Sequence, residues 1–194
     1  DTLEAKGVMI ITTDVETDKK FDGLAGKIGS TPVVVISTAQ SGDRQRFTLA
    51  HELGHMKKKH IIKGLIKGLI LSLIGFAVLG YLKNSLMFYQ GHGVQTPTNY
   101  MALTLFSMVA GVYTFFLTPI SAYFSRRYEY EADEFASQNA KASKLISALV
   151  KMYKDNASSL TPDPIFSKFY YSHPPALERV DYLEKFKILD HTLN

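Results

Sequence analysis

The residues best suited to chemistry lie in one short motif, His51-Glu52-Leu53-Gly54-His55, of the form H-E-x-x-H. On a helix, His51 and His55 are one turn apart and project from the same face. Two imidazoles at this spacing can hold a zinc ion and leave positions for a third ligand and a water molecule. Glu52 lies beside them and can accept a proton from that water, whose pKa falls to about 7. The motif therefore predicts hydrolysis by a zinc-activated water, although two surface histidines can give the same letters.

A second segment, 125–136 with the sequence SRRYEYEADEFA, offers the third ligand. Glu129 and Asp133 are four residues apart and share one face of a helix. Glu129 can complete a His-His-Glu ligand set, and Asp133 can then hold a ligating histidine by its other ring nitrogen. Glu131 lies about 200° around the helix from Glu129, so it is expected to point away. Glu131 as the ligand, or an acidic face in contact with solvent, are the alternatives.

The elements that position these residues follow from apolar runs and turn formers. Residues 1–43 are predicted to form a small α/β region, with strands at Val8–Thr12 and Val33–Ser37. Residues 44–60 are expected to form the active-site helix, which runs on into the first apolar segment. Residues 125–194 are predicted to be a helical catalytic region that carries the third ligand. The predicted fold class is mainly α, with a zincin-like H-E-x-x-H helix.

Two apolar segments, at about 61–82 and 101–124, are predicted to form a transmembrane hairpin over residues 61–124. Twenty residues at 1.5 Å rise per residue span about 30 Å of hydrocarbon, so both segments are long enough. The second segment contains no charged residue. The alternative is a soluble bundle with two very apolar buried helices.

Positive charges flank this hairpin on its outer sides. The loop between the two segments carries only Lys83 as a positive residue. The positive residues before the first segment or at its start are Lys57, Lys58, Lys59, Lys63 and Lys67. The positive residues after the second segment are Arg126 and Arg127. The positive-inside tendency then predicts a multi-pass integral membrane protein with its active site on the cytoplasmic side.

Composition excludes some classes of function. The chain has no cysteine, which excludes disulfides, thiol catalysis and cysteine-based zinc sites. The net charge of +4 is concentrated beside apolar runs, which favours membrane lipid rather than nucleic acid as a partner. His60 and His92 have no partner pattern, and His191 lies in the terminal tail. Each of the three is predicted to lie at the surface or to face lipid headgroups rather than to be a ligand. The sequence does not indicate an oligomeric state.

From His51 to about Leu183 the chain resembles the membrane-embedded gluzincin metalloproteases of the CAAX prenyl protease type. The motifs that carry the resemblance are HELGHMKKKH, SRRYEYEADEFA, ALVKMYKDN and YYSHPPALERV, in the order that the family uses. The resemblance implies a zinc endopeptidase with a single Zn²⁺ per chain, held by His51, His55 and Glu129, with Asp133 behind a ligand and Glu52 as the base. It also implies a peptide or protein substrate, with a prenylated C-terminus as one form.

The same resemblance implies that His173 and Arg179 act at the site, by stabilising an oxyanion or by holding the substrate. A helix-capping surface residue is the alternative for His173. A structural salt bridge is the alternative for Arg179.

Residues 1–55 show a second resemblance, carried by GVMIITTDVE, PVVVIS and DRQRFTLAHELGH. These segments are similar to the ImmA/IrrE group of soluble metallopeptidases, which cleave repressors, so the chain is interpreted as a composite. The leading hypothesis is a membrane-bound zinc metalloendopeptidase. The alternatives are a soluble ImmA/IrrE-like repressor-cleaving peptidase and a catalytically inactive zinc-binding membrane scaffold.

Overall fold

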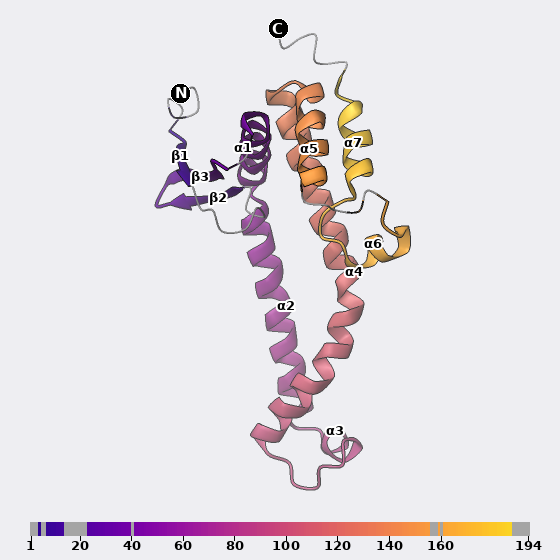
Figure 1. Cartoon of the computed structure of the whole chain (residues 1–194). Helices are drawn as coiled ribbons and strands as arrows, with labels where there is room; N and C mark the ends of the chain where they lie inside the picture. Colours follow the sequence, from indigo (N-terminus) through magenta and orange to yellow (C-terminus); the bar gives the residue numbers. More distant parts are fainter. Residues whose placement is uncertain are drawn as a thin grey trace. The chain divides into compact units, whose positions relative to one another are not determined.

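The chain divides into two compact units, which are described separately. The first comprises Asp1–His60 with Ala122–Asn194, and the second comprises Ile61–Ser121. The computed structural model describes residues 4, 7–13, 23–39, 41–155, 159 and 161–187. Figure 1 traces its strands and helices, which give the mainly helical fold with a small N-terminal sheet that the sequence predicts.

The sheet of the first unit has three strands. They are β1 (Met9–Thr13), β2 (Gly23–Ile28) and β3 (Thr31–Ser37). The central strand is β3, which is parallel to β1 and antiparallel to β2. The predicted runs correspond to β1 and β3. The strand β2 was not predicted, because its sequence GLAGKI contains two glycines and only one of the β-branched residues typical of strands, Ile28.

A tight hairpin joins β2 to β3. Ile28 pairs with Thr31 across a turn formed by Gly29 and Ser30. Gly29 has a φ of 61°, a backbone conformation that glycine adopts at little cost. Type II′ turns place glycine at this first position, and their twist matches that of the strands they join.

The helices follow the sheet. They are α1 (Gly42–Lys57), α2 (His60–Leu82), α3 (Leu86–Gly91), α4 (Asn99–Asn139), α5 (Ala142–Asp155), α6 (Pro164–Tyr170) and α7 (Ala176–Glu184). The second predicted apolar segment is the first part of α4, which continues through Pro119. The predicted boundary at residues 124 and 125 therefore falls inside a continuous helix that also carries the predicted third ligand.

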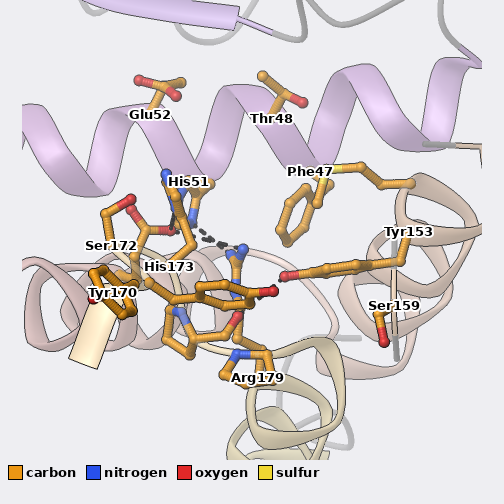
Figure 2. A pocket seen from close by; sticks show the side chains of 15 residues that line it. Phe47, Thr48, His51, Glu52, Tyr153, Ser159, Tyr170, Ser172, His173 and Arg179 are labelled. Atoms are coloured by element: carbon orange, nitrogen blue, oxygen red, sulfur yellow. Dashed lines mark hydrogen bonds and ion pairs between the residues drawn. The ribbon is translucent and has the colours of Figure 1, made fainter. Parts of the chain in front are cut away.

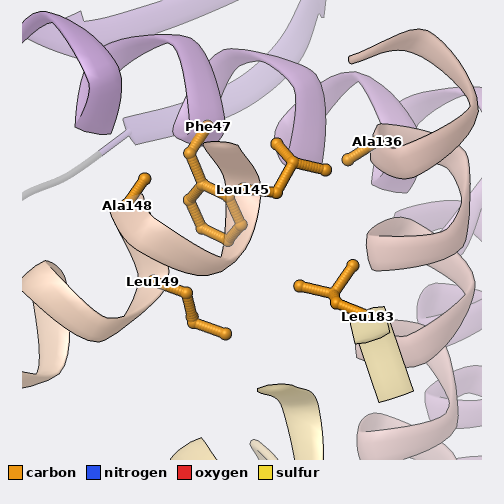
Figure 3. Close-up of a cluster of buried hydrophobic side chains, with 6 residues drawn as sticks. All are labelled: Phe47, Ala136, Leu145, Ala148, Leu149 and Leu183. Carbon is orange, nitrogen blue, oxygen red and sulfur yellow. The ribbon is translucent and has the colours of Figure 1, made fainter. Parts of the chain in front are cut away.

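Helix α1 is buried on two sides, and this fixes its position in the first unit. Leu53 packs against Val8, which precedes β1, and against the strand residues Ala25, Val34 and Ile36. Phe47 packs into a helical core with Ala136 of α4, Leu145, Ala148 and Leu149 of α5, and Leu183 of α7 (Figure 3). Burying a large apolar side chain contributes about 1.5–3 kcal/mol, so both cores hold α1 in place.

A glycine permits α1 and α4 to approach closely. A Cβ atom added to Gly54 would lie 2.8 Å from the Cα and 2.9 Å from the carbonyl oxygen of Ala132. Real Cβ atoms essentially never come so close to backbone atoms, so no larger residue fits at position 54 unless the helices separate. Gly54 lies within the H-E-x-x-H motif, one residue before His55.

The active-site helix does not run on into the first apolar segment, so that expectation was wrong. Helix α1 ends at Lys57, the chain turns at Lys58 and Lys59, and α2 begins at His60. Lys59 has a φ of 57°, a left-handed conformation that cannot continue a right-handed helix.

The second unit consists of most of α2, the helix α3 and the first part of α4. Both α2 and α4 are long and apolar enough to cross a membrane. In an apolar stretch of 18 residues within each helix, 0% of the α2 stretch and 11% of the α4 stretch is buried. Within the part of the chain that the structure describes, neither helix is therefore a buried core helix.

The contact at Gly54 gives a first prediction. Gly54→Ala is expected to destabilise the chain by about 1–3 kcal/mol, because overpacking a tight helix contact costs this much. Thermal unfolding in detergent measures the effect. Gly42→Ala is the matched control, since an added Cβ at Gly42 meets no atom within 4 Å. An unchanged unfolding temperature for Gly54→Ala would contradict the prediction.

Candidate metal site

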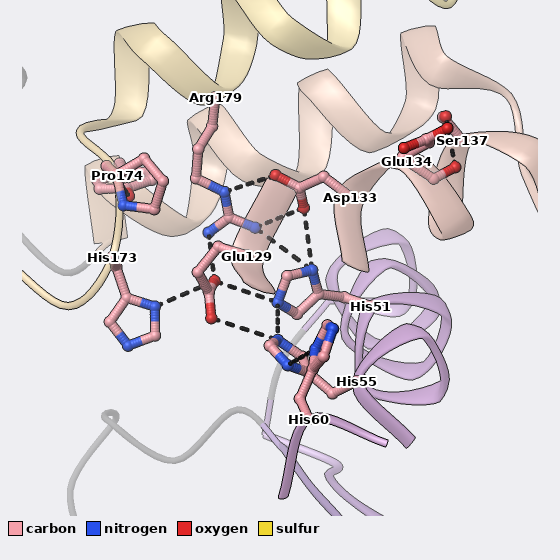
Figure 4. A network of polar contacts seen from close by, with 11 residues as sticks. His51, His55, His60, Glu129, Asp133, Glu134, Ser137, His173, Pro174 and Arg179 are labelled. Carbon is pink, nitrogen blue, oxygen red and sulfur yellow. Dashed lines mark hydrogen bonds and ion pairs between the residues drawn. The ribbon is translucent and has the colours of Figure 1, made fainter. Parts of the chain in front are cut away.

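Three side chains from α1 and α4 converge within the first unit. His51, His55 and Glu129 each offer one ligand atom, and these atoms all lie within 4.8 Å of one another. The Nε2 atoms of His51 and His55 are 3.1 Å apart. The carboxylate of Glu129 lies 3.3 Å from His51 Nε2 and 3.2 Å from His55 Nε2 (Figure 4). The structure thus brings the three predicted ligands together.

Asp133 determines how His51 is oriented. Its Oδ1 atom lies 2.9 Å from His51 Nδ1. Because a carboxylate only accepts hydrogen bonds, a neutral His51 donates from Nδ1 and keeps a lone pair on Nε2. That lone pair faces Glu129 and His55. Arg179 in turn donates to Asp133 from Nε at 2.8 Å and from Nη2 at 2.7 Å.

The separations fit a zinc ion. Zinc binds histidine nitrogen and carboxylate oxygen at about 2.0–2.2 Å with tetrahedral geometry, which places ligand atoms roughly 3.3–3.6 Å from one another. The observed separations of 3.1, 3.2 and 3.3 Å lie close to that range. Two nitrogen lone pairs and a carboxylate repel one another at these distances. A cation among them removes the repulsion.

Glu129 supplies a second indication that these residues fit a metal. Its Oε2 atom is buried and has no hydrogen bond of acceptable geometry among the described residues, although His173 Nδ1 is 3.0 Å away. A buried carboxylate oxygen without such a bond is costly. A bound cation would compensate that cost.

The electrostatics of the site favour a charged Glu129. Burial would raise its pKa, but contacts with His173, His51 and His55 outweigh burial and hold the pKa well below the usual range. Burial would lower the pKa of His51, but hydrogen bonds to Asp133 and Glu129 outweigh it and raise the pKa to about 9. A proton and a metal ion therefore compete for His51.

A cavity of about 640 Å³ adjoins this cluster. His51, Glu129, His173 and Arg179 line it together with Glu52 (Figure 2). In the view of Figure 2, Glu52 leaves α1 on the upper side and His51 leaves it on the lower side. Burial raises the pKa of Glu52. The cavity provides space for a substrate beside the predicted ligands and the predicted base.

His173 and Arg179 have different environments. The side chain of His173 is 64% exposed and its Nδ1 reaches Glu129, so this residue lies at the open side of the site. Arg179 is buried and donates its hydrogen bonds to Asp133, and its Nη1 is 3.7 Å from Glu129 Oε2. This geometry favours the structural salt bridge over contact with substrate. The catalytic roles of both residues stay predictions.

Glu131 lies outside the ligand cluster, in agreement with the expectation that it points away from Glu129. Its Oε1 accepts from Arg127 Nε at 3.1 Å, and its Oε2 lies 3.1 Å from His60 Nε2. The prediction for His60 was wrong, because this side chain is buried rather than at the surface. The motif HELGHMKKKH contains His60, but a continuous helix would have turned it away from His55.

Two histidines of an H-E-x-x-H helix and a glutamate from a second helix are the ligand set of gluzincin metallopeptidases. Comparison with known families agrees with this class. Residues 27–187 match the model of Peptidase family M48. The chain belongs to this family.

Relatives give the same result. The chain is 36% identical to the Homo sapiens protein called CAAX prenyl protease 1 homolog, over 72% of this chain and 30% of that protein. It is 31% identical to the Arabidopsis thaliana protein of the same name, over 75% of this chain and 34% of that protein. The chain thus spans about a third of the length of these relatives. The crystal structure of S. mikatae Ste24p shares the fold, with a TM-score of 0.81 at 22% identity over 94% of this chain and 48% of that one.

The family match begins at residue 27 and includes β3 and α1. It therefore extends over much of the region, residues 1–55, for which a second resemblance was predicted. A composite origin is not needed to account for residues 27–187.

The cluster predicts how the chain holds zinc. The wild-type chain is expected to retain a single zinc ion after dialysis, and zinc at 100 times its dissociation constant should stabilise folding by about 2.7 kcal/mol. Glu129→Ala removes the anionic ligand and should abolish both effects. Glu134→Ala, a change of a partly buried acid on the same helix, α4, is the control. Metal analysis and thermal unfolding give the readouts, and zinc retention by Glu129→Ala would contradict the predicted ligand set.

Proposed function

We propose that this chain is the catalytic part of a membrane-bound zinc metalloendopeptidase. The observation that carries the proposal is the convergence of His51, His55 and Glu129 at separations close to those of tetrahedral zinc ligands. The adjoining cavity gives a peptide access to these groups. Family membership supports the same reaction class.

In this proposal each residue has a distinct task. A bound zinc ion would supply a Lewis acid that polarises the scissile carbonyl and lowers the pKa of a water molecule to about 7. Glu52 takes a proton from the attacking water and then delivers it to the leaving amine. His173 donates from its exposed position to the oxygen on which negative charge develops. Arg179 acts through Asp133, which holds His51 in its ligating tautomer.

Exposed apolar side chains support a membrane location. On α2 they include Leu65, Leu69, Leu73 and Phe76, each at least 60% exposed. In water such a surface would be unfavourable, whereas lipid chains can cover it. These exposed surfaces argue against a soluble peptidase of the ImmA/IrrE kind.

The substrate class follows from the relatives only as a proposal. The similar proteins are called CAAX prenyl proteases, so a peptide with a prenylated C-terminus is the first substrate to test beside an unmodified peptide. An inactive zinc-binding membrane scaffold is the contrasting case, and it is recognised by bound zinc without turnover of either peptide.

Glu52→Gln provides the direct test of the reaction. The variant should bind zinc like the wild type but lose peptide cleavage by at least about 10²-fold, because an amide cannot accept the proton of the attacking water. Cleavage is measured on prenylated and unmodified peptides, and zinc by metal analysis.

The matched control for this test is Gln90→Glu, a reverse exchange at an exposed position of α3, away from the ligands. Its cleavage rate should stay within about twofold of the wild type, as for other surface changes. Undiminished cleavage by Glu52→Gln would overturn the role of Glu52 as the base.

The orientation in the membrane is tested with single cysteines, because the chain has none of its own. Lys144→Cys, in the unit that carries the site, should react with a membrane-impermeant maleimide only from the cytoplasmic side. Gln95→Cys, in the loop between the apolar segments, should react only from the opposite side. Both positions are exposed. Labelling of both cysteines from one side would contradict the hairpin.

A further inference from the structure

His60 lies in a buried position directly behind His55, on the side away from the other ligands. Its Nδ1 is 2.9 Å from His55 Nδ1, and its Nε2 is 3.1 Å from Glu131 Oε2. The ring stacks on Tyr128, with centroids 4.3 Å apart and planes inclined by 12°. His60 is therefore held by three neighbours from α1 and α4.

The turn between α1 and α2 creates this contact. On an uninterrupted helix His60 would follow His55 by about 140° around the axis and point elsewhere. The left-handed conformation of Lys59, with a φ of 57°, interrupts the helix one residue before His60. The ring of His60 can thus reach the Nδ1 side of His55.

Glu131 determines the directions of the two hydrogen bonds that connect His55, His60 and Glu131. The Glu131 carboxylate can only accept, so a neutral His60 carries its proton on Nε2 and has a lone pair on Nδ1. His55 must then donate from its own Nδ1. This leaves a lone pair on His55 Nε2, the atom 3.2 Å from Glu129 and 3.1 Å from His51 Nε2.

We propose that His60 and Glu131 are positioning residues that hold His55 with its Nε2 lone pair toward the metal, as Asp133 does for His51. Asp133 contacts its histidine directly, whereas Glu131 acts through the imidazole of His60. Arg127 holds Glu131 from its other side at 3.1 Å. Both histidines of the motif then present the nitrogen that a cation needs. This inference rests on the proposed metal site.

Zinc affinity provides the first test. His60→Phe keeps an aromatic ring beside Tyr128 but removes both nitrogens, and Glu131→Ala removes the terminal acceptor at a partly exposed position. Each is expected to weaken zinc binding by about 10–100-fold, the usual effect of losing a residue that orients a ligand. The double variant should be no weaker than His60→Phe alone, because Glu131 acts through His60. Dissociation constants are measured by competition with a chelator.

Two matched variants control for the changes themselves. His92→Phe replaces an exposed histidine outside the site, and Glu134→Ala removes another acid from α4. Both should bind zinc within about twofold of the wild type. If His60→Phe and Glu131→Ala also stay within that range while the wild type binds zinc, the inference is overturned. If their effects simply add, the relay through His60 is overturned.

A second readout separates this inference from the metal site itself. Two-bond ¹H–¹⁵N spectra of the metal-free chain, at a pH where His55 is neutral, show which of its nitrogens carries the proton. The wild type should hold that proton on Nδ1, and His60→Phe should shift it toward a mixture of both tautomers. A merely structural role of His60 would leave the His55 tautomer unchanged and would sink the proposal. If the wild type binds no zinc but His60→Phe still shifts the His55 tautomer, the metal site is refuted and the positioning role of His60 is not.

Discussion

The close approach of α1 and α4 at Gly54 and Ala132 is the constraint on which the rest of the first unit depends. A Cβ at position 54 would be 2.8 Å from the Ala132 backbone, so the helices can meet only because the motif contains glycine there. This contact lies between His51 and His55 on one helix and between Glu129 and Asp133 on the other. It sets the distance between the two halves of the candidate site, and the cores around Phe47 and Leu53 hold α1 in place.

Two carboxylates that accept hydrogen bonds, on the far side of the histidines from the candidate metal site, orient the side chains of that site. Asp133 and Glu131 lie behind His51 and His55, directly in one case and through His60 in the other. Because ionised carboxylates accept and never donate hydrogen bonds, the imidazole protons of His51 and His55 lie on Nδ1, away from the candidate metal site. Their Nε2 lone pairs then face the candidate metal site. Asp133 and Glu131 project from opposite sides of the same stretch of α4. The sequence EYEAD thus supplies a ligand and both orienting acids from one helix.

The sequence predicted the features that depend on local spacing and missed those that depend on chain reversal. His51, His55, Glu129 and Asp133 follow from four-residue intervals on two helices, and these intervals hold in the structure. His60 could not be placed, because the left-handed Lys59 that turns it back has no signature in the run of three lysines. The strand β2 was missed for a similar reason, since GLAGKI acquires its pairing from β3 rather than from its own composition.

The burial of Arg179 was also not predictable from the sequence, and it explains why Glu129 stays available to a cation. Arg179 gives its short hydrogen bonds of 2.7 and 2.8 Å to Asp133, and Arg127 gives one of 3.1 Å to Glu131. Each orienting acid thus has its own arginine, which stabilises it as an acceptor. Glu129 instead lies 3.7 Å from the nearest Arg179 nitrogen, beyond hydrogen-bond length. The arginines therefore neutralise the acids that orient the histidines, and the carboxylate that faces the two Nε2 atoms keeps its charge for the metal.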